Sequence, residues 1–520
     1  MGWPSPCGTP RVMRRHVSPH PWFTGDTLTP TLLPLLLMSA LATPAASPVA
    51  SPAVERARES AGVPPVVAMD GSTTADVPAP EEPGPTPGHL ELLRNDWIYP
   101  GPKRTRARRG RVTAHEVVVV HEEVVGHGCK AGWGLIEGGG YLCLDRTAPT
   151  GEAPTPLPRL VAFDAPEPDE FWDYVKTGTW DRAPDDEAEA LVPWIYGKRW
   201  RRWQGVFHDS VRDHERYREA SEDQLEGNRK YHFSHIEETR RGPVLVRRNG
   251  QVVPMDGIHL YPLPRFVGRD LVADPLPPGR IAGWVHGYEG SVMRATPDAE
   301  AEVVMELEYH QFLVLDAAPA DEEGRWWRVP DGLGPGVDGF VSDEEGVRRW
   351  STAPAPDQLH PDRLWVDVDV RQQVLTVYEG LRPIYVTMVS TGKRGHSTPL
   401  GSFRIYDKMV TVDMMSREDA PEDDQYHVEA VPWSMHFWPR YALHGAYWHW
   451  GFGNRASHGC VNMSPRDAKW IFDRLHPLLP DGWHSVFEDA EHPGSVLRVR
   501  DEHELGRERR EAPGERWRGR

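Results

Sequence analysis

The stretch SHGCVNMSPRDAKWIFDRL, Ser457–Leu475, carries the clearest local signal for structure in the chain. Ser464 is a favourable helix N-cap, Pro465 suits the first helical position, and Asp467 completes a pattern like a capping box. The apolar residues recur at i, i+3, i+4 and i+7 and form one stripe: Ala468, Ile471, Phe472 and Leu475. We therefore predict a helix that packs this stripe against a sheet.

Cys460 stands just before this helix, and the stretch by itself leaves four roles open for it. It is a packed thiol, a metal ligand, half of a disulfide or a nucleophile. Gly459 lets the backbone turn sharply and lets a carbonyl group approach. The N-terminus of the helix adds modest stabilisation of negative charge. A nucleophilic role also requires a neighbouring histidine, because the pKa of a free thiol, about 8.5, is too high.

Histidine is abundant nearby, since YALHGAYWHWGFG contains His444 and His449 and a third, His458, lies close to Cys460. Taken singly, each histidine is more typical of a surface position or a satisfied core position. Together with Cys460, the three histidines make four residues of suitable types to bind zinc. However, His444 and His449 lie in a segment rich in Gly and aromatic residues, and the chain has no Cys-x-x-Cys pair. The pattern therefore does not favour a metal site.

Strand-like segments surround the predicted helix. LWVDVDV, Leu364–Val370, alternates between two faces, and VLTVYEG follows a polar turn at Arg371–Gln373, which predicts a hairpin. Ile384–Gly392 predicts a third strand, and Gly401–Val412 opens a fourth. After the helix, HSVFED and SVLRVR return to strand character. We predict a mainly β domain over residues 363–500 with one helix packed on it.

The N-terminal region is typical of an exported protein. RVMRRH supplies positive charge before an apolar run, Leu32–Ala42, and small residues follow, which predicts a signal peptide over residues 1–46. The run is too short to span a bilayer as a helix of the mature protein, so we expect no transmembrane anchor beyond the signal. We expect the protein in the periplasm or cell envelope.

The cysteines agree with this compartment. Cys129 and Cys143 frame two short apolar runs around a Gly-rich turn, a spacing that favours a disulfide across a hairpin over two free buried thiols. Cys7 would be removed with the signal. Cys460 then remains unpaired, which makes it a candidate reactive group.

Composition divides the rest of the chain. Its 520 residues suggest several domains, and its 51 prolines point to linkers and irregular loops. We predict a Pro/Ala-rich disordered linker over 47–92, a small β module over 93–148, a region of unassigned function over 149–280, a second β module over 281–350, a linker over 351–362 and a charged disordered tail over 501–520. The net charge of −18 argues against nucleic acid as the main partner. The basic runs Lys103–Arg111 and Lys198–Trp203 are read as solvated patches or as contacts to an anionic surface.

Several segments together resemble the active-site signature of the L,D-transpeptidases, which have a YkuD-type catalytic domain. His444–Gly445 is followed by SHGCVN at Ser457–Asn462. VDVDVRQQVLTVYEG resembles the opening hairpin of the family. VSTGKRGHSTPLGSFRIYDK, Val389–Lys408, and VPWSMHFWPRYALHG, Val431–Gly445, resemble two further family segments in the same order. The loosely matching Gly-Phe-Val that follows a Trp-Trp strand in 281–350 resembles bacterial SH3-like modules, a type that both β modules would share.

The resemblance implies a fold and a set of roles. The fold would be a mainly β multidomain chain with a C-terminal β-sandwich. Cys460 would be the nucleophile, His444 the general base and Gly445 the residue whose backbone carbonyl orients His444. Backbone N–H groups of Gly459 and Cys460 would form the oxyanion hole. Ser457 and His458 would line the substrate site, and Asn462 would hold the loop or contact the substrate. The resemblance implies no cofactor.

The reaction implied is acyl transfer on peptidoglycan stem peptides. Cys460 would release D-Ala from a tetrapeptide donor and form a thioester, and an amine would resolve the thioester to a 3→3 cross-link. Water as acceptor would make the protein an L,D-carboxypeptidase, and a protein amine would make it an anchoring enzyme. The resemblance also implies acylation of Cys460 by carbapenems. The rival of another class is a non-catalytic scaffold that binds the cell wall. The oligomeric state is not set by the sequence.

Overall fold

The computed structural model describes residues 88–153, 191–200, 203, 205–216, 225–352, 354–356, 359, 363–417, 419–421 and 424–501. The expected signal peptide, the linker up to residue 87 and the tail after Asp501 lie outside these residues. The described part is mainly β, with two α-helices, α2 (Val211–Glu215) and α3 (Pro465–Phe472). Neither has the length and apolar character that a membrane-spanning helix needs.

The first described module begins earlier than the sequence predicts. Strand β1 covers Gly88–Leu92, so the expected linker to residue 92 ends too late. The module's five-stranded sheet has the order β6-β5-β4-β1-β7. Its other strands are β4 (Val117–Val124), β5 (Trp133–Ile136), β6 (Gly140–Cys143) and β7 (Thr147–Pro149). A disulfide joins Cys129 to Cys143, and the two Cα atoms are 5.6 Å apart.

The region that the sequence leaves unassigned also contains a β module. Strands β8 (Ile195–Arg199), β9 (Arg229–Phe233) and β13 (Ile258–Leu260) pair with one another. A separate three-stranded sheet contains β10 (His235–Thr239), β11 (Gly242–Val246) and β12 (Val252–Pro254). Helix α2 begins at the N-cap Ser210, whose side chain accepts a hydrogen bond from the N–H of Asp213.

Two small sheets make up the module at 280–349. The first has the order β18-β15-β21 and the second β17-β16-β20-β19. The strands are β15 (Arg280–Val285), β16 (Ser291–Arg294), β17 (Val303–Leu307), β18 (Phe312–Asp316), β19 (Trp326–Val329), β20 (Gly339–Ser342) and β21 (Val347–Arg349). The SH3-like character of the two modules stays a prediction.

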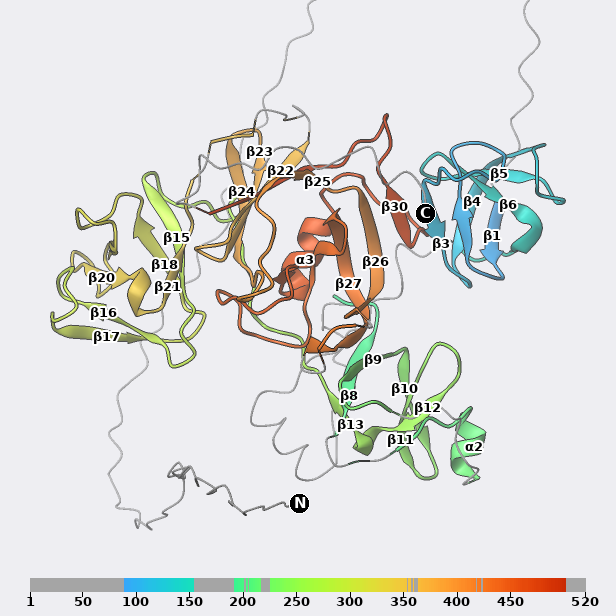
Figure 1. The fold of residues 1–520 in the computed structure, drawn as a ribbon, viewed down its shortest axis with the longest axis horizontal. Coiled ribbons are helices and arrows are strands. Elements are labelled where there is room, and N and C mark those ends of the chain that lie inside the picture. Colours follow the sequence, from blue (N-terminus) through green and yellow to red (C-terminus); the bar gives the residue numbers. More distant parts are fainter. Residues whose placement is uncertain are drawn as a thin grey trace, which may run out of the picture. The chain divides into compact units, whose positions relative to one another are not determined.

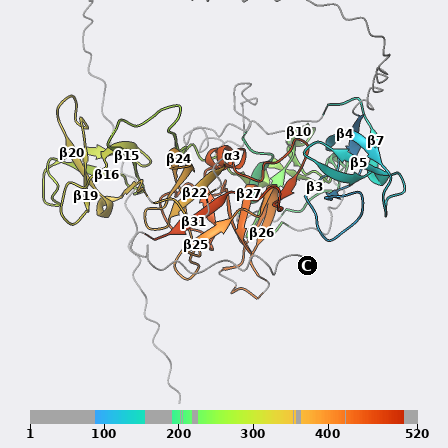
Figure 2. The same cartoon turned by 90° about the horizontal axis from the view of Figure 1, so that it is seen from above.

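The C-terminal domain is built from two sheets with α3 packed between them. One sheet has the order β14-β24-β23-β22-β31-β25. Its strands are β14 (Arg269–Asp270), β22 (Leu364–Asp369), β23 (Val374–Glu379), β24 (Arg382–Met388), β25 (Gly401–Arg404) and β31 (Val496–Arg500). Figure 2 shows β31 between β22 and β25. The predicted hairpin is β22–β23, which pairs antiparallel from Leu364–Glu379 to Asp369–Val374.

The second sheet of this domain carries the long strands β26 (Asp407–Met415) and β27 (His427–Trp438), and Figure 1 shows α3 beside them. Its further strands are β28 (Tyr441–Gly445), β29 (Val461–Met463) and β30 (Ser485–Phe487), joined by β2 (Asp96–Ile98) and β3 (Gly110–Val112) of the first module. The predicted fourth strand over Gly401–Val412 is therefore two strands in two different sheets.

The predicted helix is confirmed, but it ends at Phe472, so Leu475 of the predicted stripe lies just beyond it. Ser464 Oγ accepts the N–H of Asp467, and Pro465 takes the first helical position. The four stripe residues are fully buried in the core shared by both sheets. Fully burying a large apolar side chain contributes about 1.5–3 kcal/mol, so this stripe fixes the helix between the sheets.

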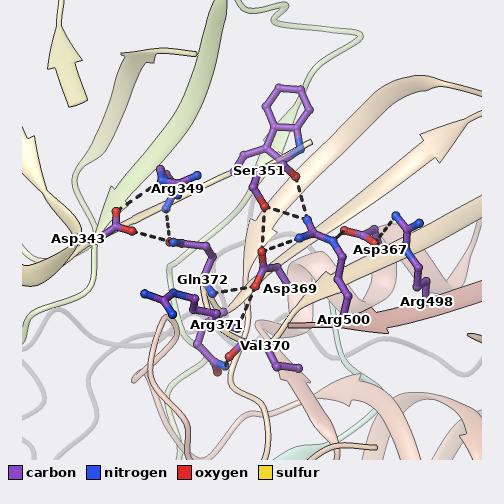
Figure 3. Close-up of polar contacts among 12 residues, drawn as sticks. Asp343, Arg349, Ser351, Asp367, Asp369, Val370, Arg371, Gln372, Arg498 and Arg500 are labelled. Carbon is purple, nitrogen blue, oxygen red and sulfur yellow. Dashed lines mark hydrogen bonds and ion pairs between the residues drawn. The ribbon is translucent and has the colours of Figure 1, made fainter. Parts of the chain in front are cut away.

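The face of β22 that carries Asp367 and Asp369 is buried, and Figure 3 shows the polar network there. Since β22 pairs in parallel with β31, Asp367 lies opposite Arg498 and Asp369 lies opposite Arg500. Arg498 Nε is 2.7 Å from Asp367 Oδ1, and Arg500 bridges both aspartates at 2.8 and 2.9 Å. Ser351, in the expected linker, donates to Asp369 at 2.9 Å. Each buried charge therefore has an opposite charge in contact.

Candidate active site

His444 and Cys460 are brought together by two adjacent strands. Strand β28 ends in His444–Gly445, and β29 begins one residue after Cys460. The strands pair in parallel, with His444 opposite Asn462. Continued by one residue, this register places Cys460 level with Ala442, two residues before His444 on the neighbouring strand. His444 is buried, whereas Cys460 is partly exposed.

The His444 ring has a defined tautomer. Its Nδ1 lies 3.2 Å from the carbonyl oxygen of Gly445. Because a carbonyl can only accept, Nδ1 carries the proton and Nε2 keeps a free lone pair. Burial lowers the pKa of His444 to about 4, although the bond to Gly445 opposes this shift. His444 is therefore neutral at pH 7 and able to accept a proton. The orienting role of the Gly445 carbonyl stays a prediction, with which this contact agrees.

The Cys460 thiol is a free cysteine and is protonated at rest. Its Sγ lies 3.7 Å from the carbonyl oxygen of Arg440. Burial raises the pKa of Cys460 to about 11, and a backbone hydrogen bond at Ala442 opposes this shift. The same desolvation that keeps the thiol neutral keeps the His444 imidazole neutral. Formation of the thiolate at neutral pH therefore requires transfer of the proton to a base as attack occurs.

A tight loop precedes Cys460. Ser457 Oγ donates to the carbonyl oxygen of Cys460 at 2.5 Å and accepts the N–H of Gly459 at 3.0 Å. Gly459 has φ +115°, and a Cβ there would lie 2.2 Å from the Tyr441 ring, so only glycine fits. The Gly459 N–H is thus occupied by Ser457. Its predicted oxyanion role requires that this bond open, and it stays a prediction.

Thr398 is a residue of this site that the role assignment from sequence misses. Its Oγ1 donates to the carbonyl oxygen of Gly459 at 2.9 Å and accepts the N–H of Gly392 at 3.0 Å. Thr398 is 5% exposed, so these partners have little access to water. Its position in the Ser-Thr-Gly…Thr-Pro segment was the available signal. The side chain fixes the peptide that leads into Cys460.

Gln373 supports the same loop from the other sheet. Its side-chain amide donates to Thr391 Oγ1 at 2.6 Å and accepts the N–H of Thr391 at 2.8 Å. The Thr391 carbonyl in turn accepts the N–H groups of Ala456 and Ser457. Gln373 was read from sequence only as part of a polar turn, but it is 1% exposed. The turn between β22 and β23 therefore helps position the loop before Cys460.

Comparison with known proteins identifies the domain. Residues 363–487 match the YkuD family, the L,D-transpeptidase catalytic domain. These residues form a YkuD domain.

Two curated relatives match parts of the chain. One is the putative L,D-transpeptidase YciB of Bacillus subtilis, 23% identical over 139 residues, which are 23% of this chain and 64% of the relative. Another is L,D-transpeptidase 1 of Mycobacterium tuberculosis, 38% identical over 92 residues, which are 16% of this chain and 36% of the relative. The chain thus spans less than two thirds of the length of each.

The chain is also similar to solved structures of L,D-transpeptidases, with low TM-scores over the whole chain. The Cys-to-Ser mutant of an Enterococcus faecium L,D-transpeptidase has a TM-score of 0.20 at 20% identity, covering 26% of this chain and 50% of that chain. L,D-transpeptidase 3 of Mycobacterium tuberculosis with a faropenem-derived adduct has a TM-score of 0.22 at 19% identity, covering 42% and 97%.

The other predicted site residues of the YkuD domain point in different directions. Asn462 is buried, its side chain lies 2.9 Å from His449 Nε2, and its backbone pairs with Ser390. It therefore holds the loop. His458 Nε2 lies 3.3 Å from Asp424 Oδ1. Since His444, His449 and His458 each bond a different partner, the zinc set considered from sequence does not assemble among the described residues.

The module at 191–260 contacts the YkuD domain through Glu429 of β27. Strand β9 pairs in parallel with β27. The Glu429 carboxylate is 1% exposed. Its hydrogen-bond partners on the module are Arg229, His232 and Arg247, at 2.7–3.3 Å. Burial raises the pKa of Glu429, but these partners outweigh burial and lower it to about 2. The carboxylate is therefore charged and joins the module to the YkuD domain.

The same strand pairing places Lys230 beside the site. Lys230 Nζ lies 5.9 Å from the centre of the Trp448 ring, and Trp448 lies 5.7 Å from the His444 ring between centroids. Burial, with a contribution from Lys198, lowers the pKa of Lys230 to about 8. Lys230 lies outside the YkuD domain. It thus places an ammonium group next to Trp448, whose ring is a neighbour of the candidate base His444. No local sequence pattern indicates this.

Proposed function

We propose that this protein is an exported cysteine acyltransferase that acts on peptidoglycan stem peptides as an L,D-transpeptidase. One observation carries the proposal: the YkuD domain holds a neutral His444 with an accepting Nε2 on β28, and a free Cys460 directly before the adjacent strand β29. The match to the family supports the substrate class, and the tautomer of His444 supports the chemistry.

The proposed reaction has two acyl-transfer steps. Cys460 Sγ attacks the carbonyl carbon of the L-centre before the terminal D-Ala, and His444 Nε2 takes the thiol proton. The C–N bond breaks, D-Ala leaves as an amine with the proton from His444, and a thioester remains. A second amine then gives its proton to His444 and attacks the thioester, which restores the thiol. The Cys460 N–H is the proposed donor to the oxyanion in both steps.

Export is part of the proposal. The Cys129–Cys143 disulfide supports it, because disulfides persist in oxidising compartments. The periplasm or cell envelope is also where stem peptides lie. The predicted signal over 1–46 stays a prediction.

Product analysis tests the proposed function. The full mature chain is incubated with muropeptides that carry tetrapeptide stems, and the products are separated and weighed. A 3→3 cross-linked dimer supports transpeptidation, a tripeptide monomer supports the carboxypeptidase alternative, and a stem joined to a protein amine supports anchoring. Unchanged muropeptides would support the non-catalytic scaffold and contradict the proposal.

The pH dependence of Cys460 acylation should reflect the lowered pKa of His444. A histidine accepts a proton only above its pKa, so the rate should fall as the pH drops through about 4. At pH 5.5 the acylation rate by a carbapenem should stay close to its neutral-pH value. An unshifted histidine with pKa about 6.5 would leave roughly a tenth of the rate there. Circular dichroism across the range controls for unfolding, and an acid limb near 6.5 would contradict the assignment.

A Thr398→Val variant should slow acylation of Cys460 about tenfold. Valine keeps the shape but leaves the Gly459 carbonyl and the Gly392 N–H without their partner, at about 1–3 kcal/mol for a buried group. Stopped-flow measurement of carbapenem acylation gives the rate. Thr398→Ser restores the hydroxyl and should recover most of it. Equal rates for the valine variant and the unchanged protein would remove Thr398 from the site.

A further inference from the structure

Three ligand-type side chains meet beside the Cys460 loop. They are His396, Asp424 and His458, from the segments before β25, before β27 and before β29. Asp424 Oδ1 lies 3.3 Å from His458 Nε2, and Asp424 Oδ2 lies 3.5 Å from His396 Nε2. All three ligand atoms lie within 4.8 Å of one another. The catalytic assignment uses neither His396 nor Asp424.

The geometry is close to that of a first-row transition-metal site. Two ligands at the usual Zn–N and Zn–O distances of about 2.0–2.2 Å lie about 3.3–3.5 Å apart in a tetrahedron. The two nitrogen–oxygen separations already have this length. The His396 and His458 rings are 4.6 Å apart between centroids, so small rotations would bring their nitrogens to one ion.

The charges also suit a cation. Lys393 Nζ lies 3.1 Å from Asp424 Oδ1, so the carboxyl group already contacts one cation. Since the Asp424 carboxylate can only accept, His458 Nε2 carries a proton in this contact, and a metal ion bound there would displace that proton. About a third of each side chain is exposed, which leaves room for a water ligand.

We propose that His396, Asp424 and His458 bind one divalent transition-metal ion of the zinc class at the entrance to the active site. The ion would fasten the β26–β27 connection, through Asp424, to the loop two residues before Cys460. The Tyr426 ring, from the same connection, already lies 5.0 Å from the His458 ring between centroids. The Lys393 ammonium holds Asp424 when no ion is bound, so the metal and Lys393 compete for one carboxylate. The site does not depend on the proposed acyl transfer.

Metal titration of the full chain tests this site. A Cys460→Ala background removes the thiol as a ligand, and chelator treatment removes bound metal. Calorimetry with Zn²⁺ and visible absorption with Co²⁺ should show one equivalent bound. Asp424→Asn and His396→Ala should each weaken binding at least tenfold. His121→Ala, which alters a surface pair with Glu137 at 2.6 Å, is the matched control and should bind normally.

Lys393→Ala distinguishes this site from adventitious histidine binding. Removal of the competing ammonium should tighten Co²⁺ binding about threefold or more, and circular dichroism checks the fold of each variant. Unchanged affinity in the Asp424 and His396 variants would place the ion elsewhere and overturn the proposal. Loss of binding in Cys460→Ala alone would make the thiol a ligand, and no binding in any protein would exclude the site. The last two results also overturn it.

Discussion

A Cys460→Ala variant is expected to gain no mass from a carbapenem, whereas the unchanged protein should gain one acylating molecule. Cys460 is the free cysteine of the described residues, and it directly precedes the strand that pairs with the strand of His444. Removal of the nucleophile should also lower turnover of a tetrapeptide donor by about 10³-fold or more. Intact-mass spectrometry and muropeptide analysis measure the two effects.

Two further variants separate the roles in this reaction. His444→Ala should keep the thiol but slow acylation about 10²–10⁴-fold, because the proton has lost its acceptor. A Cys129→Ala/Cys143→Ala double variant, which lacks the disulfide, should still gain one molecule. An adduct of equal yield on Cys460→Ala would show that another residue reacts, and the assignment of Cys460 would be wrong.

An Asp367→Ala variant should destabilise the YkuD domain by about 3–5 kcal/mol. The substitution leaves Arg498 and Arg500 buried, with side chains 6% exposed, and removes the carboxylate that both contact. Asp369 still contacts Arg500, so Arg498 loses most. In urea unfolding of the full chain, the transition of this domain should have its midpoint at a clearly lower urea concentration, and other transitions should change little.

A matched control uses an exposed ion pair on the same sheet. Glu379 contacts Arg382 at 2.7 Å with both side chains more than half exposed. Glu379→Ala should change stability by less than about 1 kcal/mol, since exposed pairs contribute little. If Asp367→Ala lowered the free energy of unfolding by no more than Glu379→Ala, the buried network would not stabilise the domain.

The network in Figure 3 also contacts the preceding module. Gln372 donates to Asp343 Oδ2 at 2.7 Å and accepts the N–H of Arg349 at 3.3 Å. The next residue, Gln373, bonds Thr391 behind the Cys460 loop. The turn between β22 and β23 therefore contacts the module on one side and the active-site loop on the other.

Much of the secondary structure of the C-terminal domain could be predicted from the sequence, because it depends on residues close together in the chain. A cap and a stripe involve residues within one or two turns, and the Ser464 cap and the buried Ile471 and Phe472 follow from them. The hairpin follows from alternation around a short turn. The His444 and Cys460 pairing was predicted through resemblance to a family rather than from periodicity.

Other features required contacts between distant parts of the chain. The sequence indicated that β22 has two different faces. Only its pairing with β31 makes the aspartates buried ion-pair partners, and Asp367 and Arg498 are 131 residues apart in the chain. The break between β25 and β26 arises because the two segments join different sheets.

By itself, the sequence determined the helix behind Cys460 and most of the strands around it, and through a family resemblance it predicted His444 and Cys460 as the reacting side chains. The tertiary structure decided which groups surround them: Thr398 and Gln373 behind the loop, Lys230 beside Trp448, and Asp424 between two histidines. The physical reason is the distance along the chain over which each kind of interaction acts. Backbone conformation responds to neighbours a few residues away, whereas burial, charge pairing and pKa depend on side chains that only the folded chain brings into contact.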